Sequence, residues 1–335
     1  MLNVISLEIE NIPDQRWNER LIESELGTIY QTKEMGAYYL TQNLKPIYLK
    51  FVNPNGTIVG QVLLVEFSRF LNRGKKGNIL KKIPGVKKLL CKWVYGPLVF
   101  ENDFASEIYQ ALGNFLLEKN YVVKGSQHPL SINGISSLQK KFRLTKWSTS
   151  LIDLNKNEDE LYENITKHSG RKNIERSIKR DVVIQETTES NLKEFLDLLY
   201  MNKANRNATN EEHEDMCNWW KILKPIGYSG FLAKKNEVLI GGIMFSAFHN
   251  YIIEGGVARS EDDTKMKLYS QDLIKWKIIQ WGIKNKMKYY DLAGFNPNPK
   301  SKKEEGIIRY KKKWGGKDFE YQKITSNKRF GKNFV

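Results

Sequence analysis

The residues best suited to chemistry lie in the last third of the chain, where a strand-like segment ends on an acidic side chain. Residues 289–292 are aromatic or apolar apart from Asp291, which predicts a short buried strand with a carboxylate at its tip. A Pro-, Asn- and Lys-rich loop follows at 296–305, and then a basic, aromatic segment, 306–316, that ends on two glycines. Such a combination is typical of a transferase site carried by a loop. A solvated lysine run with a simple glycine turn is the alternative interpretation.

The sequence lacks the patterns of several common enzyme classes. Its 4 histidines stand far apart and show no ligand spacing, so we expect no metal site. It has no Gly-x-Ser-x-Gly elbow, no phosphate-binding P-loop and no Gly-x-Gly-x-x-Gly motif. These absences disfavour a hydrolase, a kinase and a dehydrogenase, and we expect no bound cofactor.

Several motifs together resemble one family. The segments 149–154 and 171–179, with the C-terminal motif, resemble the Fem-type aminoacyltransferases that build peptidoglycan interpeptide bridges, and equally the FemAB-like GNAT-fold N-acyltransferases. The family pattern Tyr-Asp-Leu-x-Gly, then Gly-aliphatic-x-x-aromatic-Lys-x-x-aromatic-Gly-Gly, fits at 290–316. Weaker signatures fit at 27–32 and 95–97. The resemblance is spread over nearly the whole chain.

The order of expected elements supports a tandem fold. A chain of 335 residues is long enough for two domains. A strand pair, a long strand, a helix and a further strand occur in both halves, which is the order of a GNAT half. The helix of the second half, 268–286, carries two apolar stripes, which predicts burial on more than one side. We predict an α/β (α+β) protein with two tandem GNAT-like domains and mixed central sheets. The expected domains are 1–148, with a basic excursion at 67–100, and 149–316, followed by a basic tail, 317–335, that could pack back on the first domain.

The resemblance also implies roles for single residues. The family's aromatic-Lys pair falls on Tyr310 and Lys311, and its lysine is associated with substrate phosphates and developing charge. Arg206 matches a family arginine and could grip a phosphate or carboxylate, or only interact with a helix dipole. Asp291 could orient Lys311 or accept a proton, or only cap the next turn.

In the first domain, the family has an acidic site residue after a Gly-Pro turn. Glu101 and Asp103 both lie near that place after Gly96-Pro97. The sequence does not choose between them, and either acid could instead cap the helix that follows.

The charge of the chain predicts polyanionic partners. The formal net charge is +16, which favours contact with nucleic acid, anionic lipid or phosphorylated substrates, although solvated lysines are the alternative. From Phe67 to Phe100 there is no acidic residue, and basic and apolar residues alternate. This segment predicts a basic amphipathic excursion that binds a membrane face or tRNA phosphates, or else a solvated loop. The expected anion-binding residues are Lys75, Lys76, Lys81, Lys82, Lys87 and Lys88.

The expected location is cytoplasmic, with peripheral binding at the inner face of the membrane. No apolar run approaches the length that spans a bilayer, and the first residues alternate like a strand instead of forming a signal peptide. The 2 cysteines, Cys91 and Cys217, cannot form a disulfide framework, which indicates a reducing compartment.

The nature of the donor follows from a missing loop. Ordinary GNAT enzymes hold the pyrophosphate of coenzyme A with a Gln/Arg-x-x-Gly-x-Gly/Ala loop, which is absent here and, by the resemblance, in Fem-type enzymes. We therefore predict transfer of an amino acid from aminoacyl-tRNA to an amine of a nucleotide- or lipid-linked, peptidoglycan-type envelope precursor. The alternatives are an acyl-CoA-dependent N-acyltransferase acting on an amino sugar, and a non-catalytic tRNA- or lipid-binding domain.

Overall fold

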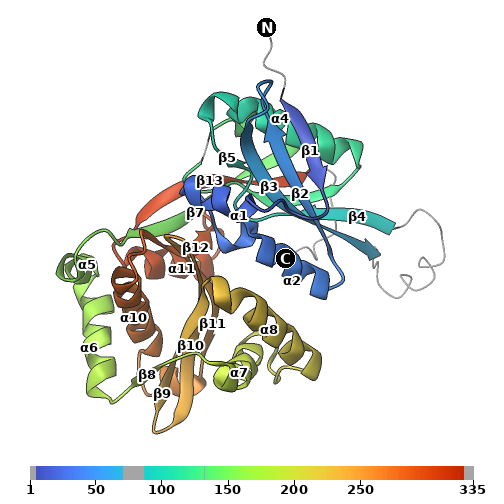
Figure 1. Ribbon diagram of the computed structural model, residues 1–335. Coiled ribbons are helices and arrows are strands. Elements are labelled where there is room, and N and C mark those ends of the chain that lie inside the picture. Colours follow the sequence, from blue (N-terminus) through green and yellow to red (C-terminus); the bar gives the residue numbers. More distant parts are fainter. Residues whose placement is uncertain (1–4, 71–86, 132, 328–335) are drawn as a thin grey trace. The chain divides into compact units, whose positions relative to one another are not determined.

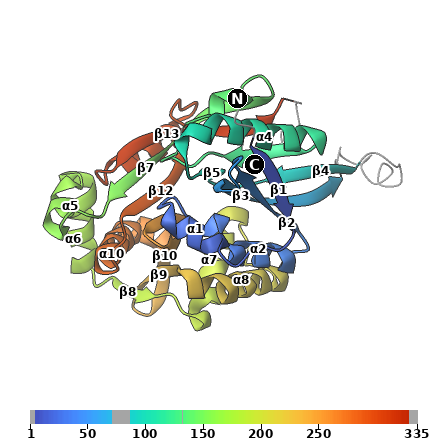
Figure 2. The same ribbon diagram turned by 45° about the horizontal axis from the view of Figure 1, so that its top comes forward.

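The computed structural model describes residues 5–70, 87–131 and 133–327. The chain divides into two compact units: unit 1 comprises Met1–Trp147 with Glu320–Val335, and unit 2 comprises Ser148–Phe319. In both units, helices pack on a mixed β-sheet (Figures 1 and 2). The chain passes between the units in two strands, β7 (Phe142–Asp153) and β13 (Lys317–Ser326).

The sheet of unit 1 has the strand order β1-β2-β3-β4-β6-β13. Its remaining strands are β1 (Ser6–Glu10), β2 (Lys45–Val52), β3 (Ile58–Phe70), β4 (Lys87–Lys92), β6 (Val122–Ser126) and the short β5 (Leu98–Val99), which pairs with β3. The pair β4–β6 is parallel, whereas the other neighbours in this order are antiparallel. The parallel pair needs a crossover, which the helix between the two strands provides.

Helices cover both faces of the unit 1 sheet. The crossover helix α4 (Ala105–Glu118) buries one apolar stripe in a core that also contains Leu49, Val62 and Val123. The other face carries α1 (Trp17–Glu23) and α2 (Lys33–Thr41) over β2 and β3. There the Trp17 ring packs edge-on against Tyr48, with centroids 4.9 Å apart.

The sheet of unit 2 has the strand order β7-β12-β11-β10-β9-β8. Its other strands are β8 (Val183–Glu186), β9 (Tyr228–Lys235), β10 (Val238–Phe248), β11 (Tyr251–Arg259) and β12 (Tyr289–Phe295). The parallel strands β11 and β12 pair only over Tyr251–Ile253 and Tyr289–Asp291, although both strands continue beyond these residues. The two strands therefore diverge after Ile253 and Asp291.

Unit 2 also has helices on both faces. One face carries α5 (Glu158–Asn164), a π-helix (Lys167–Arg171), α6 (Lys172–Lys179) and α10 (Ser270–Lys284). The other carries α7 (Leu192–Ala204), with α8 (Asn210–Leu223) beside it (Figure 1). The short α9 (Glu261–Lys265) precedes α10, and α11 (Lys302–Lys312) follows β12. Wide burial of α10, from Leu273 to Ile279, agrees with its two predicted apolar stripes.

The sequence reasoning missed several elements: α2, α8, α9, α11, β4, β5, β8 and β13. Helix α11 buries no residue completely, so it lacks the apolar stripe by which helices are recognised. Its N-cap Ser301 accepts a hydrogen bond from the Glu304 amide, a local signal that was present in the sequence. Helix α8 begins with a complete capping box between Thr209 and Glu212.

Candidate functional site

The lysine singled out by the sequence holds the bulged end of β12. The register between β12 and β7 shifts between Asp291 and Gly294, and Ala293 has a positive φ of 64°. From α11, the Lys311 Nζ donates to the carbonyl oxygens of Leu292 at 2.6 Å, Ala293 at 2.5 Å and Gly294 at 3.4 Å. The ammonium therefore satisfies carbonyls that the bulge removes from the sheet ladder.

Asp291 holds the same bulge through a backbone amide. This carboxylate is fully buried and accepts hydrogen bonds from the Thr149 hydroxyl, from the Tyr251 hydroxyl at 3.0 Å and from the Ala293 amide at 2.8 Å. The bond to Ala293, two residues further on, is the turn-capping arrangement considered for this residue. Asp291 thus acts on the site by fixing the backbone next to Lys311.

Burial changes the acid–base behaviour of Lys311. Burial lowers the pKa of Lys311 from 10.5 to about 8, against the opposing effect of the Glu254 carboxylate. A lysine with this pKa is partly neutral near physiological pH, so it can accept a proton from an attacking amine. Acyl transfer to an amine requires that proton to be removed.

A buried ionic network lies where β11 and β12 diverge. The Lys275 ammonium, on a side chain that is 2% exposed, pairs with Glu254, the first β11 residue after the paired register. The Tyr290 hydroxyl donates to the same carboxylate at 2.7 Å. These three side chains therefore form one charged, hydrogen-bonded cluster at the level where the two strands separate.

A second ion pair continues this network. Lys313 pairs with Asp272 of α10 and donates to the Ser169 carbonyl at 3.1 Å, while Asn173 donates to Asp272 at 2.8 Å. The Tyr310 ring lies beneath both amines, 4.1 Å from Lys313 Nζ and 5.4 Å from Lys275 Nζ. Tyr310 is therefore a packing partner of these two lysines, as well as the neighbour of Lys311 in sequence.

The sequence reasoning did not identify this network, although one signal was present. Lys275 and Asp272 are charged residues inside the stretch of α10 that was predicted to be buried on more than one side. A charged side chain that is almost completely buried is nearly always paired. Glu254 lies inside a strand and gave no signal of its own.

A groove in unit 2 borders the exposed side of α11. Its cavity volume is ≈ 560 Å³, and it is lined by Thr166, Ser169, Pro299, Glu305, Ile308, Arg309, Lys312 and Lys313. Lys312 and Arg309 are exposed here, next in the helix to the half-buried Lys311 and Tyr310. The groove therefore offers cationic side chains beside the lysine with the lowered pKa.

The beginning of α10 is closed by carboxylates. In the first turn of this helix the Ser270 amide donates to Asp263 at 2.8 Å, and Asp263, which is fully buried, also pairs with Arg259. The preceding α9 has three acids in its first turn, Glu261, Asp262 and Asp263. A helix N-terminus ordinarily attracts anions, but here a carboxylate of the protein already occupies it.

Arg206 is engaged in the turn between α7 and α8. Its guanidinium makes two hydrogen bonds to Glu212, at 2.8 Å and 2.9 Å, and stacks over Tyr200 at 4.9 Å. This bidentate bond lowers the pKa of Glu212 to about 2. The arginine is exposed, so a ligand that reaches it would compete with Glu212.

Glu101 and Asp103 lie in unit 1 at the start of the α4 segment. Both are exposed, and α4 begins after Phe104 without a side-chain cap. The capping role considered for these acids is therefore not seen.

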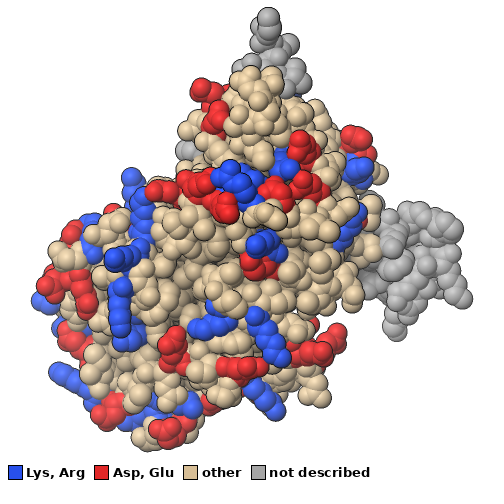
Figure 3. Space-filling model, in the orientation of Figure 1, with Lys and Arg blue, Asp and Glu red and all other residues tan. Residues whose placement is uncertain are grey.

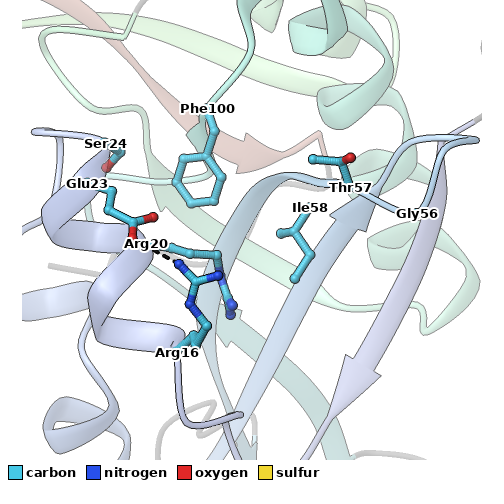
Figure 4. A pocket seen from close by; sticks show the side chains of 8 residues that line it. All are labelled: Arg16, Arg20, Glu23, Ser24, Gly56, Thr57, Ile58 and Phe100. Carbon is cyan, nitrogen blue, oxygen red and sulfur yellow. Dashed lines mark hydrogen bonds and ion pairs between the residues drawn. The ribbon is translucent and has the colours of Figure 1, made fainter.

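The neighbouring Phe100 lines a hollow of ≈ 470 Å³ in unit 1 (Figure 4). Two arginines also line it, but Arg16 bonds Glu23 at 2.9 Å and Arg20 bonds Asp14 at 2.7 Å. Their charges are thus already balanced.

The lysines predicted to bind anions lie outside the described residues. This applies to Lys75, Lys76, Lys81 and Lys82, and to the side chains of Lys87 and Lys88, whose backbone forms the start of β4. On the face shown in Figure 3, lysines and arginines are interspersed with acids instead of forming one continuous basic patch.

Two features are absent from the described part of the chain. Within it, no cluster of three or more His, Cys, Asp or Glu residues could hold a metal ion. None of its helices is long and apolar enough to cross a membrane.

Comparisons with known proteins identify the fold. No family model and no curated protein sequence matches this chain. Among solved structures, FemX is similar with a TM-score of 0.69 and 13% identity, over 94% of this chain and 96% of FemX. L-PGS from Bacillus licheniformis has a TM-score of 0.54 and 12% identity, over 96% and 95% of the two chains. A tandem GNAT protein from the clavulanic acid biosynthesis pathway has a TM-score of 0.54 and 10% identity, over 96% and 97%. The chain has a Fem-like, tandem GNAT α/β fold.

Proposed function

We propose that the chain is an aminoacyltransferase that moves an amino acid from aminoacyl-tRNA to an amine of a cell-envelope precursor. The observation that carries this proposal is Lys311, a half-buried lysine with a pKa of about 8 held at the bulged end of β12. Its place in the aromatic-Lys motif and the Fem-like fold both support transfer chemistry of the Fem type.

The chemistry asks three things of the site. The acceptor amine must lose a proton, it must lie close to the ester carbonyl, and the developing oxyanion must be stabilised. Lys311 with its lowered pKa suits the first task or, when protonated, the third. Asp291 and Tyr310 act as positioning residues: Asp291 fixes the β12 bulge that Lys311 binds, and Tyr310 packs next to Lys311 in α11.

The closed beginning of α10 favours a tRNA ester over acyl-CoA at this unit. A pyrophosphate such as that of coenzyme A is suited to a helix N-terminus, but here Asp263 accepts the Ser270 amide and α9 adds further acids. The Ser270 amide is therefore already engaged and would have to leave Asp263 to bind a pyrophosphate. The groove beside α11, with Arg309 and Lys312, instead offers contacts for the terminal phosphates of an RNA donor.

The acceptor and its location belong to the same proposal. A nucleotide- or lipid-linked precursor carries phosphates. Arg206 in unit 2 and the basic segment 67–100 in unit 1 are separate candidates for binding phosphates. A peripheral position at an anionic inner membrane face fits the abundance of lysine in that segment. The two acids after the Gly96-Pro97 turn, Glu101 and Asp103, are the candidates for binding the acceptor in unit 1.

A transfer assay with separate donors tests the proposal. Purified protein is supplied either with tRNA charged with radiolabelled amino acids or with radiolabelled acyl-CoA. Both reactions contain the amine acceptors of envelope precursors. Label on the acceptor only from charged tRNA is the expected result. Label only from acyl-CoA would replace the proposal by an N-acyltransferase, and binding of tRNA without transfer from either donor would leave a binding domain.

A further inference from the structure

One face of the unit 1 sheet carries a row of lysines that lies outside the site in unit 2. In β4, β6 and β13, the residues Cys91, Val123 and Ile324 point into the core beneath α4. Since side chains alternate along a strand, Lys92, Lys124 and Lys323 point to the opposite face. We call these three residues the lysine face.

The strand register brings the three lysines close together. Lys92 is the partner of Lys124 between β4 and β6, Lys124 is the partner of Thr325, and Lys323 is the partner of Ser126. Neighbouring strands lie about 4.8 Å apart, so Lys92 and Lys124 lie side by side, and Lys323 lies diagonally from Lys124 on the next strand. The other residues that these strands place on this face are Leu90, Val122, Ser126, Tyr321 and Thr325, none of which is acidic.

Aromatic rings accompany the row. Lys92 Nζ lies 4.8 Å from the ring centre of Phe67, and Lys323 Nζ lies 3.2 Å from that of Trp147. Partial burial, and then the nearby positive charge of Lys124, lower the pKa of Lys323 to about 8. A partly buried amine that lies beside a second amine would be stabilised by a bound anion.

We propose that the lysine face binds the sugar–phosphate backbone of an RNA strand, with the neighbouring rings available to stack on its bases. Sheet faces that combine basic side chains with aromatic rings suit single-stranded RNA. A lipid surface is a weaker fit, because these lysines are half-buried on a sheet instead of projecting from it. This inference rests on the proposed function, in which RNA carries the donor, and assigns a second contact to it in unit 1.

Binding of deacylated tRNA to the full-length protein tests the inference without any transfer reaction. The variant carries Lys124→Met and Lys323→Met, which keep an unbranched aliphatic side chain at both positions, at position 323 against Trp147. The control carries Lys119→Met and Lys140→Met. Both lysines are exposed and lie outside the lysine face, Lys119 at the C-terminal end of α4. The variant and the control differ from the wild type by the same charge, and thermal unfolding and circular dichroism show whether each is folded.

The lysine-face variant should bind tRNA about 10-fold more weakly at about 0.1 M salt. The slope of log K against log salt concentration should be shallower by about 2, because each lysine that no longer neutralises a phosphate reduces it by about 1. The control should bind nearly as the wild type does. If Lys124→Met/Lys323→Met unfolds, the single Lys124→Met change should still give about half the change in slope, because Lys124 packs on none of the described aromatic rings.

Equally weakened binding in variant and control would show general charge attraction and overturn the inference. So would unchanged tRNA binding, or a defect confined to vesicles containing phosphatidylglycerol, which would assign the face to a membrane. The proposed function fails separately: if the wild type transfers nothing from charged tRNA but the variant binds tRNA more weakly as expected, the lysine face stands and the aminoacyltransferase does not.

Discussion

Asp291 and Lys311 hold one backbone bulge by its opposite polarities. The Asp291 carboxylate accepts the Ala293 amide at 2.8 Å, while the Lys311 ammonium binds the Leu292 and Ala293 carbonyls at 2.6 Å and 2.5 Å. The bulge lies at the end of the strand that diverges from β11. The two charged residues therefore fix the backbone at the place where β11 and β12 separate. This contact explains why the motif contains both an acid at position 291 and a lysine at position 311.

Replacing Lys311 should separate its role from that of its neighbour. Lys311→Ala removes both the proton acceptor and the anchor of the bulge, so kcat/KM for transfer should fall by about 10²–10³-fold. Lys312→Ala removes only an exposed amine of the groove, so it should raise KM for the donor by a few fold and leave kcat nearly unchanged. Steady-state kinetics with both variants measure this, and equal, small effects would mean that neither lysine takes part in the transfer reaction.

The sequence predicted the tandem fold better than it predicted the site. Motif order and the repeated strand–helix–strand pattern indicated two GNAT-like units, because buried strands and the stripes of α10 leave a strong apolar signal. Helix α11 buries no residue completely, so its residues were interpreted as a loop and a charged run. Lys311 was recognised by resemblance, whereas its three carbonyl partners follow from the bulge at Ala293, which no periodicity predicts.

The glycine pair after α11 should be intolerant of side chains for a backbone reason. Gly315 has a φ of +72°, and a Cβ there would lie 2.8 Å from the Asn164 carbonyl oxygen. Gly315→Ala should lower the free energy of unfolding by about 1–3 kcal/mol, as measured by urea denaturation. Gly306→Ala is the control: it lies inside α11 with nothing within 4 Å of its Cβ, so it should stabilise by up to about 1 kcal/mol. Destabilisation by both changes would argue against this backbone account.

The buried pair Lys275–Glu254 should behave as a coupled unit. Lys275→Met leaves the Glu254 carboxylate with the Tyr290 hydroxyl and little solvent, so it should cost about 3–5 kcal/mol of unfolding free energy. Glu254→Gln should cost a similar amount, because it leaves a buried ammonium. The double variant should cost clearly less than the two single changes added together. Costs that simply add in urea unfolding would show that the two charges are not coupled.

The pH dependence of activity and stability should report the neutral form of Lys311. Burial lowers its pKa from 10.5 to about 8, so kcat/KM should rise with pH through about 8 if the neutral amine is the base. This rising limb of the pH profile should be absent from the residual activity of Lys311→Met. The stability effect has the same sign. Between about pH 8 and 10.5 the unfolded chain binds more protons at this residue than the folded chain does, so wild-type stability should rise with pH relative to Lys311→Met over that interval. A wild-type profile without the limb, together with parallel stability curves, would show that Lys311 stays charged and acts only as the anchor of the bulge.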